Sequence, residues 1–355
     1  MASIKKLITV FVVAISILLG VIVLIRGVDF SKNETEIKKD KLRVQAGWLL
    51  NGEFANVCSA IVNGFYDEEN LEVELIPGGP SGASFIVATT AVAQDSSIDI
   101  GIDGDLVPLL KGVTKQKETE KYKVRAFASF WTDNPYGFMV RKSSGITSLK
   151  DFSKRKPNGE KIKIGVTADA VIQEPLSKYA GVEMKELDFV TVGFDATPLL
   201  VNQVDALAGY WTTQAYELEK AKVEYLFLPI SELPGFEQPS MIAVASEKTL
   251  NEKKDQLARW LRATIRGSEF VIKNPEKAAR DILDARCGGP SFKEEQELWL
   301  IKKSIPLFDQ DNIGGLNFNQ IEKFVESFYE LGQISSIPER FQYLDTSILD
   351  LVREQ

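Results

Sequence analysis

The spacing of hydrophobic and polar residues divides the chain into an apolar N-terminal segment, a short polar stretch and a long α/β region. Residues 7–25 carry no charge, and Lys5 and Lys6 precede them while Arg26 follows. A helix of this length, at about 1.5 Å per residue, matches the roughly 30 Å hydrocarbon core of a bilayer. We interpret residues 1–28 as a transmembrane anchor, and the lysines predict that the chain beyond it lies outside the cytoplasm.

A cleaved signal peptide is the alternative interpretation of the same segment, and cleavage would give a secreted protein. Residues 29–40 are polar and of mixed charge, which predicts a solvated linker. The folded region is therefore expected on the periplasmic or extracellular face of the cytoplasmic membrane, anchored by residues 7–25 unless that segment is removed.

Beyond the linker, strand patterns alternate with apolar residues at helical spacing, and this predicts parallel sheets with helices on both faces. Predicted strands and extended segments span residues 42–48, 71–76, 98–102, 124–131, 137–141, 161–166, 188–194, 205–210, 223–228 and 240–246. Predicted helices span residues 52–66, 84–94, 171–180, 197–203, 213–221, 253–274, 275–286 and 317–332. Pro275 fits a first helical turn, Asn317 or Asn319 a cap and Gly332 a helix end.

Two α/β series joined by extended crossings predict two lobes around a hinged cleft. Lobe 1 is assigned residues 41–138 and 241–355, and lobe 2 residues 139–240. Beyond Leu250 the pattern is helical, so a helical C-terminal section completes the molecule.

Composition narrows the possible chemistry. A net charge of −8 without any long basic run argues against nucleic-acid binding. Cys58 and Cys287 are far apart in the sequence and lack metal-site spacing, which favours two buried apolar side chains. The chain contains no histidine, so Ser/His or Cys/His nucleophilic catalysis is excluded. Neither a cofactor nor a metal is expected.

Candidate ligand-binding residues follow the ends of the predicted strands, because open α/β sheets bind ligands beyond the carboxyl ends of their strands. These residues are Trp48, Asn51, Glu53, Asp103, Trp131, Asn134, Tyr136, Asp169, Asp195, Tyr210, Trp211 and Gln214, and the same positions also include Thr167, Phe194 and Thr212. Aromatic rings combined with a few hydrogen-bonding groups suit a flat heteroaromatic ligand.

Structural roles are the alternatives at several of these positions. Trp48 could close one end of a sheet, and Asp103 could serve the turn that it forms with glycine. Glu53 could balance a helix dipole without any ligand. Tyr210 and Trp211 are adjacent, so only one of the two faces the cleft if the backbone is extended there.

Several segments together resemble a known family. These are GWLLNGEF (47–54), NGFYDEENLEVELIPGGPS (63–81), IDIGI (98–102), SGITSLKDF (144–152), IGV (164–166), VGFDATPLLVNQVDALAGYWTTQ (192–214) and RWLRATIRGSEFVIKNPEKAARDIL (259–283). In this order they are similar to the thiamine-pyrimidine-synthase-like group of ABC-transporter substrate-binding proteins. The resemblance implies a two-lobed periplasmic-binding-protein-like type II fold. It also implies capture of a small nitrogen heterocycle, a thiamine pyrimidine precursor or a flavin-like ring, for an ABC permease and its ATPase.

The same family includes an enzyme that builds the thiamine pyrimidine from pyridoxal phosphate and one of its own histidines. Where that pattern has a lysine and a histidine, this chain has Asp103 and Val107. It also has TADAV (167–171) in place of a glycine-rich phosphate loop, and PGFEQPSM (234–241) in place of a cysteine-rich stretch. Without the lysine no Schiff base can form. We therefore expect a binding protein and not an enzyme.

The expected mechanism is closure of the two lobes on the ligand, with rotation near Gly137 and Ser240. Three alternatives stay open. One is a pyrimidine-synthase-like enzyme of thiamine biosynthesis, and another is an enzyme that uses Asp103 and Asp105 as acid and base. The third is a membrane-tethered sensor that reports ligand occupancy to a partner.

Overall fold

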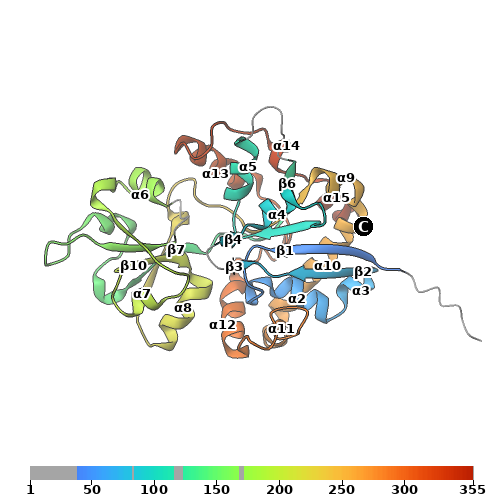
Figure 1. The fold of residues 1–355 in the computed structure, drawn as a ribbon, viewed down its shortest axis with the longest axis horizontal. Helices are drawn as coiled ribbons and strands as arrows, with labels where there is room; N and C mark the ends of the chain where they lie inside the picture. The colour runs from blue at the N-terminus through green and yellow to red at the C-terminus, as the bar shows by residue number, and fades with distance from the viewer. Residues whose placement is uncertain (1–37, 82–83, 116–122, 168–171, 355) are drawn as a thin grey trace, which may run out of the picture. The chain divides into compact units, whose positions relative to one another are not determined.

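Two β-sheets organise the part of the chain that the computed structural model describes, residues 38–354 without 82–83, 116–122 and 168–171 (Figure 1). The first sheet has the order β2 (Leu71–Ile76), β1 (Asp40–Ala46), β5 (Ile100–Asp103), β12 (Ser240–Ser246) and β6 (Val124–Trp131). The second has the order β11 (Tyr225–Pro229), β7 (Tyr136–Arg141), β10 (Ala206–Tyr210), β8 (Lys163–Val166) and β9 (Asp188–Thr191). A hairpin of β3 (Gly79–Ser81) and β4 (Ser84–Ile86) is separate from both.

Both sheets are mixed, whereas the alternation of strands and helices predicted parallel sheets. In the first sheet β1 pairs in parallel with β2 and β5, but β12 runs antiparallel to β5 and β6. In the second, β8 pairs in parallel with β9 and β10, but β7 runs antiparallel to β10 and β11. The exceptions are β7 and β12, the two strands that follow a crossing of the chain from one sheet to the other. Each enters its new sheet against the direction of its neighbours.

We call the first sheet with the elements packed on it the first lobe, and the second sheet with its elements the second lobe. Both lie in one compact unit, Lys39–Gln355. The strand β7 begins at Tyr136 and belongs entirely to the second sheet, whereas the prediction divided the lobes at residue 138. The return crossing ends at Ser240, where β12 begins.

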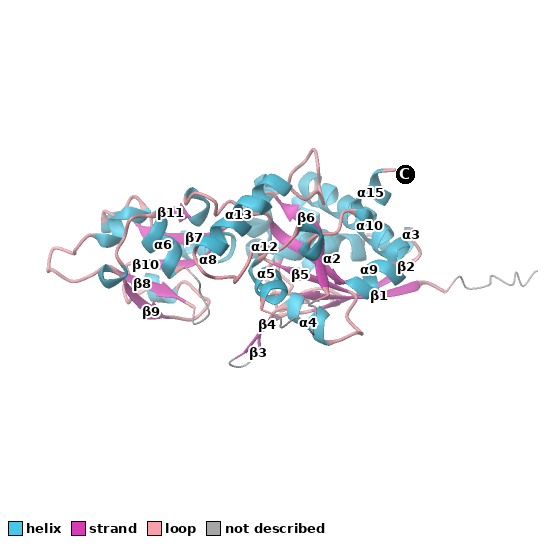
Figure 2. Ribbon diagram, turned by 90° about the horizontal axis from the view of Figure 1, so that it is seen from above, coloured by secondary structure: helices cyan, strands magenta, loops and turns pink. Residues whose placement is uncertain are grey.

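Helices flank both sheets (Figure 2). The α-helices are α2 (Ala55–Val62), α3 (Phe65–Glu68), α4 (Ala88–Gln94), α5 (Val107–Thr114), α6 (Gln173–Tyr179), α7 (Thr197–Leu200), α8 (Trp211–Lys220), α9 (Glu247–Glu252), α10 (Lys254–Lys273), α11 (Pro275–Ile282), α12 (Glu294–Ser304), α13 (Phe318–Glu330), α14 (Arg340–Tyr343) and α15 (Ser347–Arg353). The 3-10 helices are η1 (Gly52–Phe54), η2 (Lys142–Ser144), η3 (Leu149–Ser153), η4 (Met184–Glu186), η5 (Ile230–Glu232) and η6 (Ile305–Leu307). The helical C-terminal section is thus as predicted.

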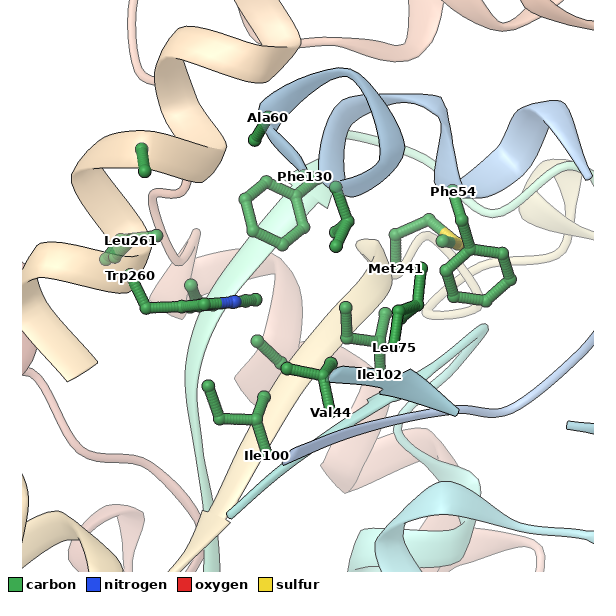
Figure 3. Close-up of a cluster of buried hydrophobic side chains, with 14 of the residues drawn as sticks. Val44, Phe54, Ala60, Leu75, Ile100, Ile102, Phe130, Met241, Trp260 and Leu261 are labelled. Atoms are coloured by element: carbon green, nitrogen blue, oxygen red, sulfur yellow. The ribbon is translucent and has the colours of Figure 1, made fainter. Parts of the chain in front are cut away.

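The core of the first lobe follows from the apolar face of α10. Leu257, Trp260 and Leu261 recur at helical spacing, and all three are buried. The Trp260 ring lies edge-on to Phe127 and Phe130 of β6, with ring centroids 5.8 and 6.2 Å apart. Figure 3 shows Trp260 and Phe130 between the helices and the strands. This packing fixes the sheet whose strand ends form the site described below.

Sequence signals set several helix ends as expected. Pro275 lies in the first turn of α11, and Asn317 caps α13 by accepting a hydrogen bond from the Gln320 amide. Gly332 follows α13 with φ +68°, a left-handed conformation that favours glycine. Other elements differ from the prediction: residues 84–86 form β4 instead of a helix, and α9, α12, α14 and α15 were not predicted.

A contact between α8 and α12 joins the two lobes away from the crossings. The Trp299 indole N–H of α12 donates a 2.7 Å hydrogen bond to Glu219 of α8, and Lys303 forms an ion pair with the same carboxylate at 3.1 Å. The Trp299 ring also lies edge-on to Tyr216, with centroids 5.5 Å apart. We call these four residues the α8–α12 clasp.

The proposed membrane anchor, residues 7–25, lies outside the described residues. Within residues 38–354, apart from the gaps given above, no helix is both long and apolar enough to cross a bilayer.

Candidate functional site

A cavity of about 320 Å³ lies between the ends of the two sheets. Its lining comes from both lobes: Gly47, Trp48, Glu53, Phe54, Val87, Ile102, Asp103, Gly104, Asp105, Val107, Pro108, Lys111, Asn134, Tyr136, Thr167, Ile172, Phe194, Ala208, Gly209, Tyr210, Thr213, Gln214, Ile230, Phe236, Gln238, Met241, Phe324 and Phe328. The volume is at the lower end of the range of about 300–1,000 Å³ that is typical of ligand pockets, which suits a small ligand.

Two aromatic residues from opposite lobes meet at this pocket. Trp48 follows β1 in the first lobe, and Phe194 follows β9 in the second. Their ring centroids are 5.2 Å apart at an interplanar angle of 64°, an edge-to-face contact. The Phe194 side chain is still 39% exposed, so a ligand can reach it from the pocket. We call Trp48 and Phe194 the aromatic pair.

Gln214 holds the backbone that carries Phe194. Its side-chain amide N–H donates a 3.1 Å hydrogen bond to the Phe194 carbonyl, and its amide oxygen accepts one of 2.7 Å from the Thr213 hydroxyl. Both residues lie in the first turn of α8, directly after β10. Gln214 therefore lines the pocket and also fixes the second lobe's half of the aromatic pair.

The two lobes also touch through Tyr210 and Gly104. A β-carbon added at Gly104 would lie 2.6 Å from the Tyr210 hydroxyl oxygen, so a larger residue here would force the Tyr210 ring to move. The Asn134 amide N–H donates to the Gly104 carbonyl at 3.1 Å, and Tyr136 lies edge-on to Tyr210 at 5.7 Å. Burial raises the pKa of the Tyr210 phenol well above its usual value, so the hydroxyl stays protonated.

Glu53 is the buried carboxyl group of the pocket. Asn51 caps η1 by accepting a 3.1 Å hydrogen bond from the Glu53 amide, and this turn directs the Glu53 side chain between the lobes. There Glu53 accepts a 3.1 Å hydrogen bond from the Thr212 hydroxyl of α8. Burial raises the pKa of Glu53 to about 7, Thr212 opposes the rise, and the negative charge of Glu297 adds to it. At neutral pH this group can either accept or donate a proton or hydrogen bond.

Glu297 of α12 lies behind Glu53 and is only 1% exposed. Its carboxylate accepts a 2.6 Å hydrogen bond from the Gly52 amide, which anchors η1 to α12. Burial raises the pKa of Glu297 to about 7, while the bond from Gly52 lowers it. The two carboxyl groups thus resist being charged at the same time.

Asp103 lines the pocket, but its carboxylate already accepts hydrogen bonds from within the fold. Its carboxylate accepts backbone hydrogen bonds from Ala88 at 2.9 Å and Thr89 at 2.7 Å, and a further one from the Thr89 hydroxyl. These donors lie at the start of α4, so Asp103 satisfies the exposed amides of a helix N-terminus. Burial raises the pKa of this carboxyl, and the three bonds oppose the rise.

Seven of the predicted residues line the pocket: Trp48, Glu53, Asp103, Asn134, Tyr136, Tyr210 and Gln214. Thr167 and Phe194 line it as well. Asp169 lies outside the described residues.

Four predicted residues lie away from the pocket. Trp131 is 2% exposed and packs edge-on against Phe308, because the C-terminal section covers the end of β6. Asn51 is used as the cap of η1. Trp211 is the first residue of α8, and its ring lies 6.0 Å from that of Phe227 in β11. Asp195 caps the next turn by accepting from the Thr197 amide. We correct the prediction that these side chains face the cleft.

Other lining residues were not predicted. Lys111 projects from α5, the helix after β5, and Phe324 and Phe328 project from α13, which follows the last strand, β12, after several other helices. Met241 lines the pocket at the start of β12 with φ +52°, a left-handed conformation that is unusual for this residue type. The strand-end rule cannot find side chains that come from helices, and no other signal in the sequence identified them.

The two mixed sheets and the double crossing between them define the periplasmic-binding-protein-like type II fold. A solved structure supports this fold: the periplasmic aliphatic sulphonate binding protein of Escherichia coli superposes with a TM-score of 0.63 at 12% identity, over 86% of this chain and 92% of that one. The chain belongs to the NMT1/THI5-like family, whose model matches residues 51–278.

Named relatives include both synthases and a binding protein. A 4-amino-5-hydroxymethyl-2-methylpyrimidine phosphate synthase of Legionella pneumophila is 23% identical over 309 residues, which is 83% of this chain and 90% of the relative. A formylaminopyrimidine-binding protein of Halalkalibacterium halodurans is 20% identical over 250 residues, 69% of this chain and 70% of the relative. The family resemblance inferred from the sequence is therefore confirmed.

The synthase names correct one prediction. The sequence analysis concluded that the chain is not an enzyme, because a lysine and a histidine of the synthase pattern are missing. Relatives from a bacterium and from two fungi carry the synthase name, and these findings contradict that conclusion. The pocket does contain an amine, because Lys111 lines it, although the lysine of the synthase pattern is absent.

Proposed function

We propose that the chain is the extracytoplasmic solute-binding component of an ABC importer. It captures a small nitrogen heterocycle, a pyrimidine precursor of thiamine or a flavin-like ring, as its two lobes close. The aromatic pair is the observation that carries this proposal, because Trp48 and Phe194 come from opposite lobes and meet at the same pocket. A planar ring between the lobes would contact both side chains only in the closed arrangement.

Glu53 supplies the polar half of the recognition. An aminopyrimidine presents an exocyclic N–H donor beside a ring nitrogen, and a carboxyl group with a pKa of about 7 can pair with both. The relative named formylaminopyrimidine-binding protein supports this choice of ligand. The fold shared with a periplasmic binding protein supports delivery to a membrane permease and its ATPase.

Calorimetric titration of the full chain tests the proposal. The probes are 4-amino-5-hydroxymethyl-2-methylpyrimidine, a formylaminopyrimidine and riboflavin. We expect at least one to bind, and Phe194→Ala to weaken its affinity by roughly 5- to 150-fold, since one aromatic–ring contact is worth about 1–3 kcal/mol. Phe341→Ala is the matched control, because Phe341 is 66% exposed and does not line the pocket. An unchanged affinity in the Phe194 variant would contradict the role of the aromatic pair.

The relatives' names favour a second candidate, synthesis of the pyrimidine phosphate itself. Two features of the pocket are compatible with it: the Glu53 carboxyl, whose pKa is about 7, and the Lys111 amine. The synthase of this family consumes one of its own histidines and this chain has none, so histidine must be supplied as a second substrate. Incubation of the chain with pyridoxal phosphate and free histidine, followed by mass spectrometry, tests this candidate. Formation of the pyrimidine phosphate would establish an enzyme, whereas recovery of unaltered starting material would favour solute capture.

The extracytoplasmic location and the anchor, residues 7–25, are part of the same proposal. Protease treatment of intact cells should digest the folded region if it lies outside the cytoplasm. Partners isolated by cross-linking then separate import from sensing, because a permease with an ATPase supports import and a kinase or cyclase supports a membrane-tethered sensor.

A further inference from the structure

The pocket has two chemically different regions. Glu53 lies where η1 meets α8 and α12. A second group of lining residues comes from α5, α13 and the segment before β12, and Figure 1 shows α5 and α13 on the opposite side of the sheets from α8 and α12. The pocket therefore offers a ligand a second set of contacts beyond the aromatic pair and Glu53.

Aromatic rings form the wall of the second region. Phe324 and Phe328 of α13 stack with centroids 5.4 Å apart and an interplanar angle of 20°, and Phe236 meets Phe324 edge-on at 5.9 Å. The Lys111 ammonium lies 5.9 Å from the centre of the Phe328 ring. A cation held against an aromatic face keeps its charge in surroundings where water is partly excluded.

Lys111 is the one cationic side chain among the described residues that line the pocket. The carboxylates that line it already accept hydrogen bonds: Glu53 from Thr212, Asp103 from the start of α4, and Asp105 from the Val107 amide. In the described part of the chain, no ion pair within 4.0 Å joins Lys111 to an acidic side chain. Among the described residues, the partner of its charge is the face of the Phe328 ring.

The electrostatic surroundings agree with this assignment. Burial, and then the charge of Lys115, lower the pKa of the Lys111 ammonium, while the charges of Asp105 and Glu174 oppose the shift. An anion bound beside Lys111 would offset the unfavourable free energy of burying the ammonium charge. A charge pair of this kind is stronger in partly desolvated surroundings than in water.

Resting on the proposed function, we infer that Lys111 and the rings of Phe236, Phe324 and Phe328 form an anion subsite. The ligand class is then an aromatic nitrogen heterocycle that carries an anionic substituent such as a phosphate ester. The ring lies at the aromatic pair and Glu53, and the anionic group lies at Lys111.

A pair of probes that differ only in the anion tests the subsite: 4-amino-5-hydroxymethyl-2-methylpyrimidine and its phosphate ester. Titration of the full chain should give a preference for the phosphate of about tenfold or more, as expected for a hydrogen bond to a charged group. Lys111→Gln should abolish this preference, and Lys111→Arg should retain much of it. Lys248→Gln is the control, because Lys248 is exposed and does not line the pocket, so the preference should stay unchanged.

The outcomes separate the two proposals. If the wild-type chain binds the alcohol but shows no preference for the phosphate, the proposed function stands and the subsite is refuted. The subsite is refuted also if Lys111→Gln keeps the preference. A wild-type chain that binds neither probe contradicts both the subsite and this choice of heterocycle.

Discussion

The hydroxyl of Thr212 donates a 3.1 Å hydrogen bond to Glu53 and so joins α8 of the second lobe to η1 of the first. Both side chains are buried. Glu53 therefore has two roles: its carboxyl group lines the pocket, and its hydrogen bond with Thr212 connects the two lobes. The charge of this one group is linked to the relative position of the lobes.

Removal of the Thr212 hydroxyl should destabilise the protein, and more strongly at high pH. Thr212→Val takes a donor from Glu53, and a lost bond to a charged group costs about 1–3 kcal/mol. The Thr212 bond lowers the pKa of Glu53, so it favours the ionised carboxylate. Urea denaturation at pH 5 and pH 8 measures the loss, which should be larger at pH 8. Equal losses at both values would show that the bond does not favour the charged form.

The buried carboxyl of Glu297 makes stability fall as pH rises. The unfolded chain releases this proton near pH 4.5 and the folded chain near pH 7, so the folded state binds more protons between these values. Stability should therefore decrease from about pH 4.5 to 7, by up to about 3 kcal/mol from this group, and then level off.

Glu297→Gln should flatten that decrease, because glutamine can still accept the bond from Gly52 but does not titrate. Denaturation midpoints at pH 5, 6, 7 and 8 measure the effect. Glu295→Gln is the matched control, since Glu295 lies exposed on the same helix. A slope in Glu297→Gln equal to that of the wild type would rule out this origin of the pH dependence.

A methyl group at Gly104 should weaken ligand binding through Tyr210. The added β-carbon would lie 2.6 Å from the Tyr210 hydroxyl, so Gly104→Ala should push the lobes apart. Overpacking of this kind costs about 1–3 kcal/mol, or roughly 5- to 150-fold in affinity. The double variant Gly104→Ala with Tyr210→Phe removes the clashing oxygen and should recover part of the loss. If Gly104→Ala weakens binding as much in the Tyr210→Phe background as in the wild type, the loss does not come from the clash with the Tyr210 hydroxyl.

Asp103→Ala should lower stability because of the helix that it caps. The substitution leaves the amides of Ala88 and Thr89 without their acceptor, at a cost of about 1–3 kcal/mol. Thermal unfolding measures the change. Asp103→Asn should cost less, because its amide oxygen can still accept one of these bonds. A fully stable Asp103→Ala protein would favour a ligand role over the structural one.

The sequence predicted the architecture well because local patterns and the overall fold agree. The strand alternation, Pro275 and Asn317 all report on their immediate surroundings, and the structure places them as expected. Strand direction failed at β7 and β12, because direction depends on which sheet a strand joins after a crossing. No local pattern encodes that choice.

The site was predicted in part for the same reason. Trp48 and Tyr210 follow strands, and strand ends meet at the pocket, so position alone identified them. Trp131 also follows the strand pattern, but the distant Phe308 covers it. Lys111 and Phe328 come from helices whose placement depends on packing of the C-terminal section. Contacts between residues so far apart in the sequence cannot be found from the local spacing of residues along the chain.

The α8–α12 clasp gives the molecule an optical signal of its own. Trp299 donates its indole N–H across the boundary to Glu219, and its ring rests against Tyr216. When the lobes separate, this indole would leave both neighbours and enter water, where tryptophan emits at longer wavelength. Opening of the pocket would thus shift the tryptophan fluorescence of the protein to longer wavelength, and fluorescence spectroscopy could follow the motion without an attached dye.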